Sequence, residues 1–163
     1  MKLNVELRFW EIKDAEFVIR VRNTPELQRW FRQDADLTLE EQLEFMSMTA
    51  PEISYYGFIA EINGMPIGIA ALRLCPDKSA EFCIGILPQW QGKGYTAQAV
   101  ERILSVAYNE FQCKRVWGDV FVDNPALSFY LTKCGFKATS VIEHFCYKQA
   151  VGNISAVHIE QTK

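Results

Sequence analysis

The segment Gly92-Lys93-Gly94 stands between an apolar run and a helical pattern, and its residue types suit the binding of an anion. The apolar run at residues 82–86 predicts a strand, and apolar positions at helical spacing over residues 97–111 predict a helix. Glycines allow positive φ, so such a loop can turn its backbone N–H groups toward a ligand. The start of the helix adds free amides and a favourable dipole. The segment therefore predicts a cradle for a phosphorylated ligand.

Three phosphate-binding patterns can be compared with this loop. A P-loop, G-x-x-x-x-G-K-S/T, is excluded because Leu87 stands where its first glycine belongs and Gly94 where its hydroxyl residue belongs. The dinucleotide fingerprint G-x-G-x-x-G/A fits from Gly92 onward, but it expects glycines directly after the strand, and residues 87–91 intervene. The third pattern, Q/R-x-x-G-x-G/A, fits from Gln89. A glycine-rich turn that only connects strand to helix stays a further alternative.

Composition narrows the class of protein. The 163 residues suit one domain, residues 1–163, whose core needs no disulfide or metal. A formal charge of −3 argues against a general nucleic-acid binder and is compatible with a cationic small substrate. No apolar run approaches the roughly 20 residues of a membrane span, and no signal peptide is evident, so we expect a cytoplasmic protein with no membrane partner. The five cysteines include no C-x-x-C pair, so we expect reduced thiols and no metal site.

Periodicity predicts strands and helices in a mixed order. Asp14, Thr38 and Asn124 are plausible helix caps, with Glu41 completing a capping box after Thr38. Asn63-Gly64 is the strongest short hairpin signal. Strand patterns cover residues 3–9, 56–61, 66–74, 82–86, 115–121, 136–147 and 154–159. Helical patterns follow Asp14, Thr38, Gly94 and Asn124, the last with Pro125 at its first position and Gly135 as its stop.

These elements predict an α+β fold. The unit at residues 81–121 requires a parallel crossover from strand through helix to strand, whereas the hairpins require antiparallel pairing. We therefore expect a single mixed, mostly antiparallel sheet with helices on both faces. The order is one strand, two helices, three strands, a helix, a strand, a helix and two strands.

The same order of elements is that of the GNAT superfamily of N-acetyltransferases, which the chain resembles over essentially its whole length. The loop at residues 89–94 is similar to the pyrophosphate loop of that family. The spacing from Asn124 through Tyr130 to Gly135-Phe136 matches its downstream helix. Three further segments look most like the RimJ/RimL branch and the bacterial spermidine acetyltransferases: Ala80-Glu81-Phe82, the Trp30-Phe31 loop and the Glu143-x-Phe145 strand.

The resemblance implies acetyl-CoA as the cosubstrate and no metal. The backbone of Ile84 and Ile86 is expected to pair with the pantetheine arm. Asn124 is expected beside that arm and Tyr130 near its sulfur. The pyrophosphate is expected on the backbone amides of Gln91, Gly92, Lys93, Gly94, Tyr95 and Thr96.

The implied reaction is attack of a neutral primary amine on a thioester carbonyl in a ternary complex, which needs a proton route, an oxyanion donor and an acid for the thiolate. Tyr130 can be the acid, since a phenol has a pKa of about 10; its alternative role is a core aromatic. Glu81 can accept the amine proton directly or through water, with a solvated carboxylate as its alternative. His144 and His158 lack a partner acid at informative spacing, so we expect solvated or packing roles.

The acceptor stays open among a polyamine, a nucleotide-linked amino sugar and a protein or peptide N-terminus. Trp30 and Phe31, in the irregular segment 23–31, are expected either to anchor that loop or to face the substrate beside Glu81. An acidic cluster could receive a polycation, with a solvated helix start as the alternative: Asp34, Asp36, Glu40 and Glu41.

Two other classes of function stay open. One is an NAD-dependent oxidoreductase that uses the glycine pattern at residues 92–97, and the other is a non-catalytic CoA-binding sensor of the same fold. For the amine-acetylating class we expect a small-molecule or peptide acceptor and no nucleic acid. A homodimer or a larger homo-oligomer is a possible assembly.

Overall fold

A single mixed sheet organises the computed structural model, which describes residues 3–48 and 50–163. In the described part of the chain seven strands lie in the order β1-β2-β3-β4-β5-β7-β6. All neighbours run antiparallel except the parallel pair β4 and β5, which confirms the sheet that the sequence predicted. The strands are β1 (Val5–Phe9), β2 (Tyr55–Ile62), β3 (Met65–Leu74), β4 (Ser79–Ile86), β5 (Arg115–Phe121), β6 (Lys137–Lys148) and β7 (Gly152–Thr162).

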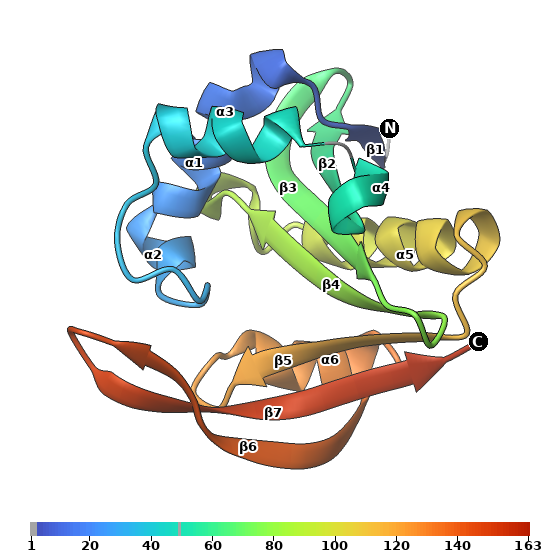
Figure 1. Cartoon of the computed structure of the whole chain (residues 1–163). Helices are drawn as coiled ribbons and strands as arrows, with labels where there is room; N and C mark the ends of the chain where they lie inside the picture. The colour runs from blue at the N-terminus through green and yellow to red at the C-terminus, as the bar shows by residue number, and fades with distance from the viewer. Residues whose placement is uncertain (1–2, 49) are drawn as a thin grey trace.

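Helices cover both faces of this sheet (Figure 1), as predicted. Ile59 packs in one apolar cluster with Val18 of α1, whereas its neighbour Phe58 packs in another with Val100 of α5. Alternate strand residues point to opposite faces, so the two clusters lie on opposite sides. The helices are α1 (Ala15–Asn23), α2 (Pro25–Gln28), α3 (Leu39–Ser47), α4 (Ala50–Ile53), α5 (Tyr95–Ser105) and α6 (Ala126–Lys133). None of the helices described has the length and apolar character that crossing a bilayer requires.

The sheet opens between β4 and β5. These strands pair only where Ser79–Glu81 meets Arg115–Trp117, and Figure 1 shows the two halves of the sheet diverging beyond that point. A side chain at Gly118 would place its Cβ 2.8 Å from the Phe82 ring, so glycine is needed there. Phe82 and Gly118 are the residues that follow the last paired residues, Glu81 and Trp117, so the Phe82 ring lies against β5 where the pairing stops. The same ring stacks on Phe136 with ring centres 4.9 Å apart. This opening positions the candidate site.

Two turns have the conformation that their glycines predicted. Asn63 and Gly64 both have positive φ, 49° and 76°, and join Ile62 to Met65 in a two-residue hairpin. Gly135, with φ of 78°, ends α6, and the backbone N–H of Phe136 bonds back to the carbonyl of Tyr130. The second turn fixes the end of the helix that carries Tyr130.

Three local predictions need correction. Asp14 does not cap α1 with its side chain, because both carboxylate oxygens accept hydrogen bonds from Arg8 at 2.7 and 2.8 Å. Segment 23–31 is not fully irregular, since it contains α2. The cap of α6 lies at Pro125, although the Asn124 side chain still accepts a hydrogen bond from the backbone N–H of Ala126 at 2.9 Å.

Candidate active site

The glycine loop has the backbone conformation that an anion cradle requires. Gly92 and Gly94 have φ of 72° and 83°, as the sequence predicted, and Gly94 immediately precedes α5. The first helical hydrogen bond runs from Gln98 N–H to the Gly94 carbonyl, so the amides of residues 95–97 have no partner within the helix. A Cβ at either glycine would meet nothing within 4 Å. The space above the loop is therefore open to a ligand.

Side chains of the loop hold it in place and leave its backbone free. The Lys93 ammonium donates to the Gln89 carbonyl at 3.0 Å and lies 5.3 Å from the centre of the Trp90 ring. Tyr95 packs against Trp90 at 6.1 Å. A 3₁₀ turn, Pro88–Trp90, separates the glycines from β4. Because a dinucleotide fingerprint places its glycines directly after a strand of a parallel sheet, the NAD alternative is not favoured.

The free edge of β4 runs from this loop toward the interior. The Ile86 carbonyl accepts a hydrogen bond from Gln91 Nε2 at 2.7 Å, whereas the next residue, Leu87, donates its N–H to Ile67 of β3. Ile86 therefore directs its backbone to the edge that β5 has left, and Ile84, two residues away, does the same. Ile84 is the freer of the two, because the Ile86 carbonyl already has a partner.

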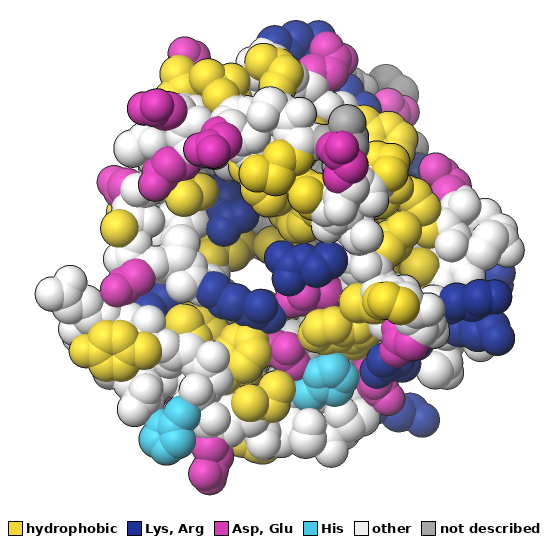
Figure 2. All heavy atoms as spheres, viewed as in Figure 1, with side chains coloured by type: hydrophobic (Ala, Val, Ile, Leu, Met, Phe, Trp, Pro, Cys, Tyr) yellow, Lys and Arg dark blue, Asp and Glu magenta, His cyan; other side chains and the backbone are white. Residues whose placement is uncertain are grey.

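A cavity of about 530 Å³ lies between the two halves of the sheet. Figure 2 shows the hollow, with Lys and Arg side chains gathered around it and acidic side chains beside them. The cavity does not include the predicted cofactor residues Ile86 and 91–96, which lie along the β4 edge and beyond it. Six predicted site residues line it: Trp30, Phe31, Glu81, Ile84, Asn124 and Tyr130.

Tyr130 lies at the inner wall of this cavity. Its side chain packs edge-on against Phe82 with ring centres 5.3 Å apart, and the residue is only 8% exposed. Its hydroxyl makes no hydrogen bond with any residue that the structure describes. Burial raises the pKa of the Tyr130 phenol well above its usual range, so the phenol keeps its proton. Tyr130 is thus a core aromatic whose residue also borders the cavity.

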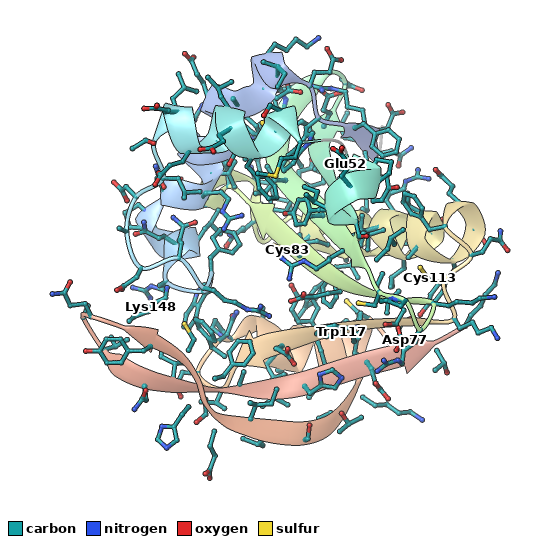
Figure 3. All side chains as sticks on the ribbon, viewed as in Figure 1. Glu52, Asp77, Cys83, Cys113, Trp117 and Lys148 are labelled. Atoms are coloured by element: carbon teal, nitrogen blue, oxygen red, sulfur yellow. The ribbon has the colours of Figure 1, made fainter. Side chains whose placement is uncertain are left out.

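Asn124 and Cys83 border the same cavity. Asn124 uses its Oδ1 to hold the first turn of α6, and its Nδ2 donates to no residue within the described ranges. Cys83 lies on β4 at the opening of the sheet (Figure 3), and burial raises the pKa of its thiol. A protonated thiol is a poor nucleophile, so Cys83 is unsuited to carry an acyl group. All five cysteines are free thiols.

Glu81 is an ion-paired carboxylate and not a solvated one. Its Oε1 lies 2.6 Å from Arg32 Nη2, its Oε2 lies 3.4 Å from Arg73 Nη1, and its side chain is 17% exposed. The two guanidinium groups hold the carboxylate at the cavity wall. An incoming amine must therefore share Glu81 with two cations.

A second carboxylate, Asp119, stands in the cavity wall beside Glu81. Asp119 Oδ1 lies 2.7 Å from His158 Nδ1, and Asp119 Oδ2 lies 3.7 Å from Arg32 Nη2. His158 thus has a partner acid that its spacing in the sequence did not indicate, and it also packs on Trp117 with ring centres 5.3 Å apart, in agreement with the expected packing role. The pair forms because β5 and β7 place residues 119 and 158 directly opposite each other, a register that no local pattern states. His144 is exposed on β6, in agreement with its solvated role.

The loop that carries Trp30 and Phe31 is tied across the opening by the hairpin of β6 and β7. Lys148, which is 7% exposed, donates its ammonium to the Gln28 carbonyl at 2.9 Å (Figure 3). The next residue, Gln149, donates its backbone N–H to Asp34 at 3.0 Å. Burial lowers the pKa of Lys148. No local pattern predicts these hydrogen bonds, because their partners are over 100 positions apart in the sequence.

The two substrate-binding candidates of the loop both border the cavity. Phe31 packs with Val21 and Leu27 in the core, as its anchoring role predicts, and it also borders the cavity; its contact with the substrate stays a prediction. Trp30 borders the cavity and has the Arg29 guanidinium 5.6 Å from its ring centre. The loop therefore anchors itself and faces the cavity at once.

The acidic cluster does not form a wall of the cavity. Only Glu41 of the four borders it, and the Glu41 carboxylate accepts hydrogen bonds from the backbone N–H and hydroxyl of Thr38 in the predicted capping box. Asp36 accepts from Gln28 Nε2 at 2.7 Å. Asp34 is engaged by Gln149, so these side chains hold local structure.

Comparison with known proteins agrees with this geometry. The family model described as acetyltransferase (GNAT) domain matches residues 4–137. Spermidine N(1)-acetyltransferase of Vibrio cholerae serotype O1 is 23% identical over 167 residues, which is 100% of this chain and 96% of that protein.

Two solved structures show the same fold. The spermidine N-acetyltransferase from Vibrio cholerae in complex with CoA and spermine has a TM-score of 0.89 at 20% identity and covers 98% of this chain and 95% of its own. The spermidine/spermine N-acetyltransferase from Vibrio cholerae in complex with manganese ions has a TM-score of 0.81 at 22% identity, with coverage of 98% and 92%. Since the family match spans most of its length, the chain belongs to the GNAT acetyltransferase family and is an acyltransferase.

Proposed function

We propose that this chain moves an acetyl group from acetyl-CoA to a primary amine by direct attack, with both substrates bound. One observation carries the proposal: the opening between β4 and β5 links the amide-rich loop to the cavity that Tyr130 borders. The free β4 edge between them has the extended geometry that an amide-bearing chain can follow. A dinucleotide site would also use a glycine loop, but it would not need an opening between two strands of the sheet.

The residues present fit acetyl-CoA. The amides at the start of α5, with Gly92 and Gly94 at positive φ, suit the pyrophosphate. The backbone of Ile84, with Ile86 in part, suits the pantetheine amides, and Asn124 Nδ2 offers a donor beside them. Bound there, acetyl-CoA supplies the activated acetyl group as a thioester.

The amine nitrogen forms a bond to the acetyl carbonyl carbon, and the carbon–sulfur bond breaks. Tyr130, which retains its proton, gives that proton to the departing sulfur. Glu81 accepts the proton that the amine loses, directly or through a water molecule, while Arg32 and Arg73 hold the carboxylate in position. The products are an acetylated amine and the free thiol, and transfer of the proton from Glu81 through solvent back to the Tyr130 phenolate restores both residues. Direct transfer is favoured over an acyl-cysteine route, because the nearby Cys83 thiol stays protonated.

Release of free thiol from acetyl-CoA over a panel of amines tests the proposal. We expect thiol release only when an amine is present, with stoichiometric formation of the acetylated amine by mass spectrometry. CoA should also raise the melting temperature and NAD should not, since a ligand at a hundredfold excess over its Kd stabilises by about 2.7 kcal/mol. Stabilisation by CoA without turnover of any amine would indicate a CoA sensor instead.

The finer assignments are part of the same proposal. We assign the chain to the RimJ/RimL-like branch as part of this proposal, and we expect it to work without a metal, in the cytoplasm and as a homodimer or larger homo-oligomer. Acceptors to compare are polyamines, which the names of the relatives suggest, amino sugars and peptide N-termini. Activity that survives a metal chelator supports metal independence, and light scattering on the purified chain gives its assembly state.

A further inference from the structure

The cavity presents more hydrogen-bond donors than the protein itself satisfies. Arg22, Arg32 and Arg73 all border it. Arg32 is engaged by Glu81 and Asp119. Among the described residues, Arg22 forms a hydrogen bond through its Nε alone, which donates to Gln33, and its guanidinium lies 5.0 Å from the centre of the Phe31 ring. In the same part of the chain Arg73 makes a single hydrogen bond, of 3.4 Å to Glu81. Within the described ranges, the remaining guanidinium nitrogens of Arg22 and Arg73 have no acceptor.

A buried amide stands in the same wall without a partner. Gln42 of α3 is only 5% exposed and borders the cavity, yet its Nε2 has no hydrogen-bond partner among the described residues. A buried donor without a hydrogen-bond partner destabilises the folded state, so few such groups occur in folded proteins unless they have a function. Binding a ligand whose acceptor atom reaches Gln42 would be such a function.

These donors line the same cavity as Tyr55, and we term the four residues the donor subsite: Arg22, Gln42, Tyr55 and Arg73. The α1 and α3 helices that carry Arg22 and Gln42 contact each other. The Arg73 guanidinium lies 5.9 Å from the Tyr55 ring centre, and Trp10 and Phe45 pack around that ring. The donor subsite adjoins Glu81 through the contact of Arg73 with that carboxylate. An anionic group and an amine can therefore be held side by side.

Charge decides which amines suit this arrangement. The carboxylates of Glu81 and Asp119 already have guanidinium partners, and the Glu41 carboxylate holds Thr38. A polyamine would bring a second ammonium group toward Arg22 and Arg73, and like charges repel. A carboxylate on the acceptor would instead meet planar guanidinium donors, which bind carboxylates in a bidentate manner.

We propose that the acceptor is an aminocarboxylate, that is, a small molecule with a primary amine directed to Glu81 and a carboxylate bound by the donor subsite. This inference rests on the proposed function. A cavity of about 530 Å³ that must also admit the acetyl end of the cosubstrate suits an acceptor of amino-acid size.

Matched amines test the proposal. Lysine and cadaverine share the same chain and terminal amine and differ by one carboxylate, as do ornithine and putrescine. We expect kcat/KM to be at least tenfold higher for each amino acid than for its diamine, and spermidine to behave like the diamines. Lysine methyl ester, which removes only the negative charge, should lose most of the advantage. Equal or better use of the diamines or spermidine would overturn the proposal.

Variants of the donor subsite identify the residues responsible. Arg22→Met and Gln42→Met should each raise KM for lysine at least fivefold and leave that for cadaverine nearly unchanged. Gln42→Met should also melt no lower than the parent, because it removes an unmet buried donor. Arg20→Met is the matched control, since Arg20 lies exposed on the same helix and loses the same charge. If a variant raised KM equally for lysine and for cadaverine, the donor subsite would not be responsible for binding the carboxylate.

Failure of this inference is distinguishable from failure of the proposed function. If diamines are acetylated as well as amino acids, the enzyme is an amine acetyltransferase and the donor subsite has no role in selecting the acceptor. If no amine is acetylated, the binding of lysine and of cadaverine to the CoA-loaded protein can still be compared by calorimetry. Binding of lysine but not of cadaverine supports the donor subsite without turnover, whereas binding of neither overturns it.

Discussion

The glycine loop and the acceptor cavity are built in different ways. Contacts that shape the loop join residues close in sequence, such as Gln91 with Ile86 and Lys93 with Gln89. Contacts that shape the cavity join distant residues, since 49 positions separate Arg32 from Glu81 and 39 separate Asp119 from His158. The loop offers backbone amides, whereas the cavity offers charged side chains.

The difference has a consequence for how each region responds to substitution. A change in the loop acts on local backbone conformation, so its effect should be confined to the cosubstrate. A change in the cavity acts on a linked set, because Arg32 contacts both Glu81 and Asp119. Contacting residues of this kind do not have additive effects. This difference can be tested with substitutions that change either the binding of acetyl-CoA or the use of the acceptor, but not both.

The largest effect is expected at Tyr130, where the two regions meet. Tyr130→Phe removes the acid for the thiolate, so kcat should fall by about a hundredfold, roughly 2.7 kcal/mol. The Kd of acetyl-CoA should change little, because the ring still packs on Phe82. Steady-state kinetics and calorimetry on one preparation measure both quantities. An unchanged kcat would leave Tyr130 with a packing role alone.

A second test confines its effect to the loop. Gly94→Val forces a β-branched residue to φ of 83° and obstructs the approach of phosphate, so the Kd of acetyl-CoA should rise at least tenfold, about 1.4 kcal/mol. Gly92→Val should act in the same direction.

Gly64→Val is the matched control for the loop. Gly64 has φ of 76°, and its Cβ would also meet nothing within 4 Å, but it lies in the hairpin of β2 and β3. The Gly64→Val variant should be less stable than the parent and should bind acetyl-CoA with unchanged affinity. If Gly94→Val and Gly64→Val bind acetyl-CoA equally well, the loop does not hold the pyrophosphate.

A third test concerns His158, which contacts the cavity residue Asp119 but does not itself border the cavity. His158→Gln should lower kcat/KM for the acceptor about threefold, because Asp119 loses the partner that orients it. The Kd of acetyl-CoA should stay the same. His144→Gln, at an exposed position of β6, serves as the control and should change neither value. A parallel loss in both variants would point to general instability of β6 and β7.

The smallest effect is expected for the acidic cluster outside the cavity. Neutralising Asp34, Asp36 and Glu40 together should leave the acceptor KM within about twofold, since none of the three borders the cavity. Thermal stability should fall slightly, because Asp34 loses its hydrogen bonds with Gln149. Measurements at low and high salt check this, because long-range steering is screened by salt. A KM that rises only at low salt would show that the cluster attracts a cationic acceptor.

The sequence by itself determined what depends on neighbours along the chain. Positive φ at Gly92 and Gly94 and the Asn63-Gly64 hairpin follow from residue type and spacing, because turns and helix ends are set by a few adjacent residues. The same local patterns predicted the helix that Gly135 ends, whereas the resemblance to a known family singled out Tyr130 on that helix. The order of the elements and the rules for connecting strands then predicted one mixed sheet, which the resemblance to a known family supported.

The tertiary structure alone decided which charged side chains meet. β7 lies between β5 and β6, and the resulting register pairs Asp119 with His158, which the sequence left without a partner. The same holds for Glu81 between two arginines and for Lys148 at the Gln28 carbonyl. Strand order and register depend on the packing of whole faces of the sheet, so the pattern of any one strand does not contain them. The acceptor site is therefore a property of the fold, whereas the cosubstrate loop is a property of its own few residues.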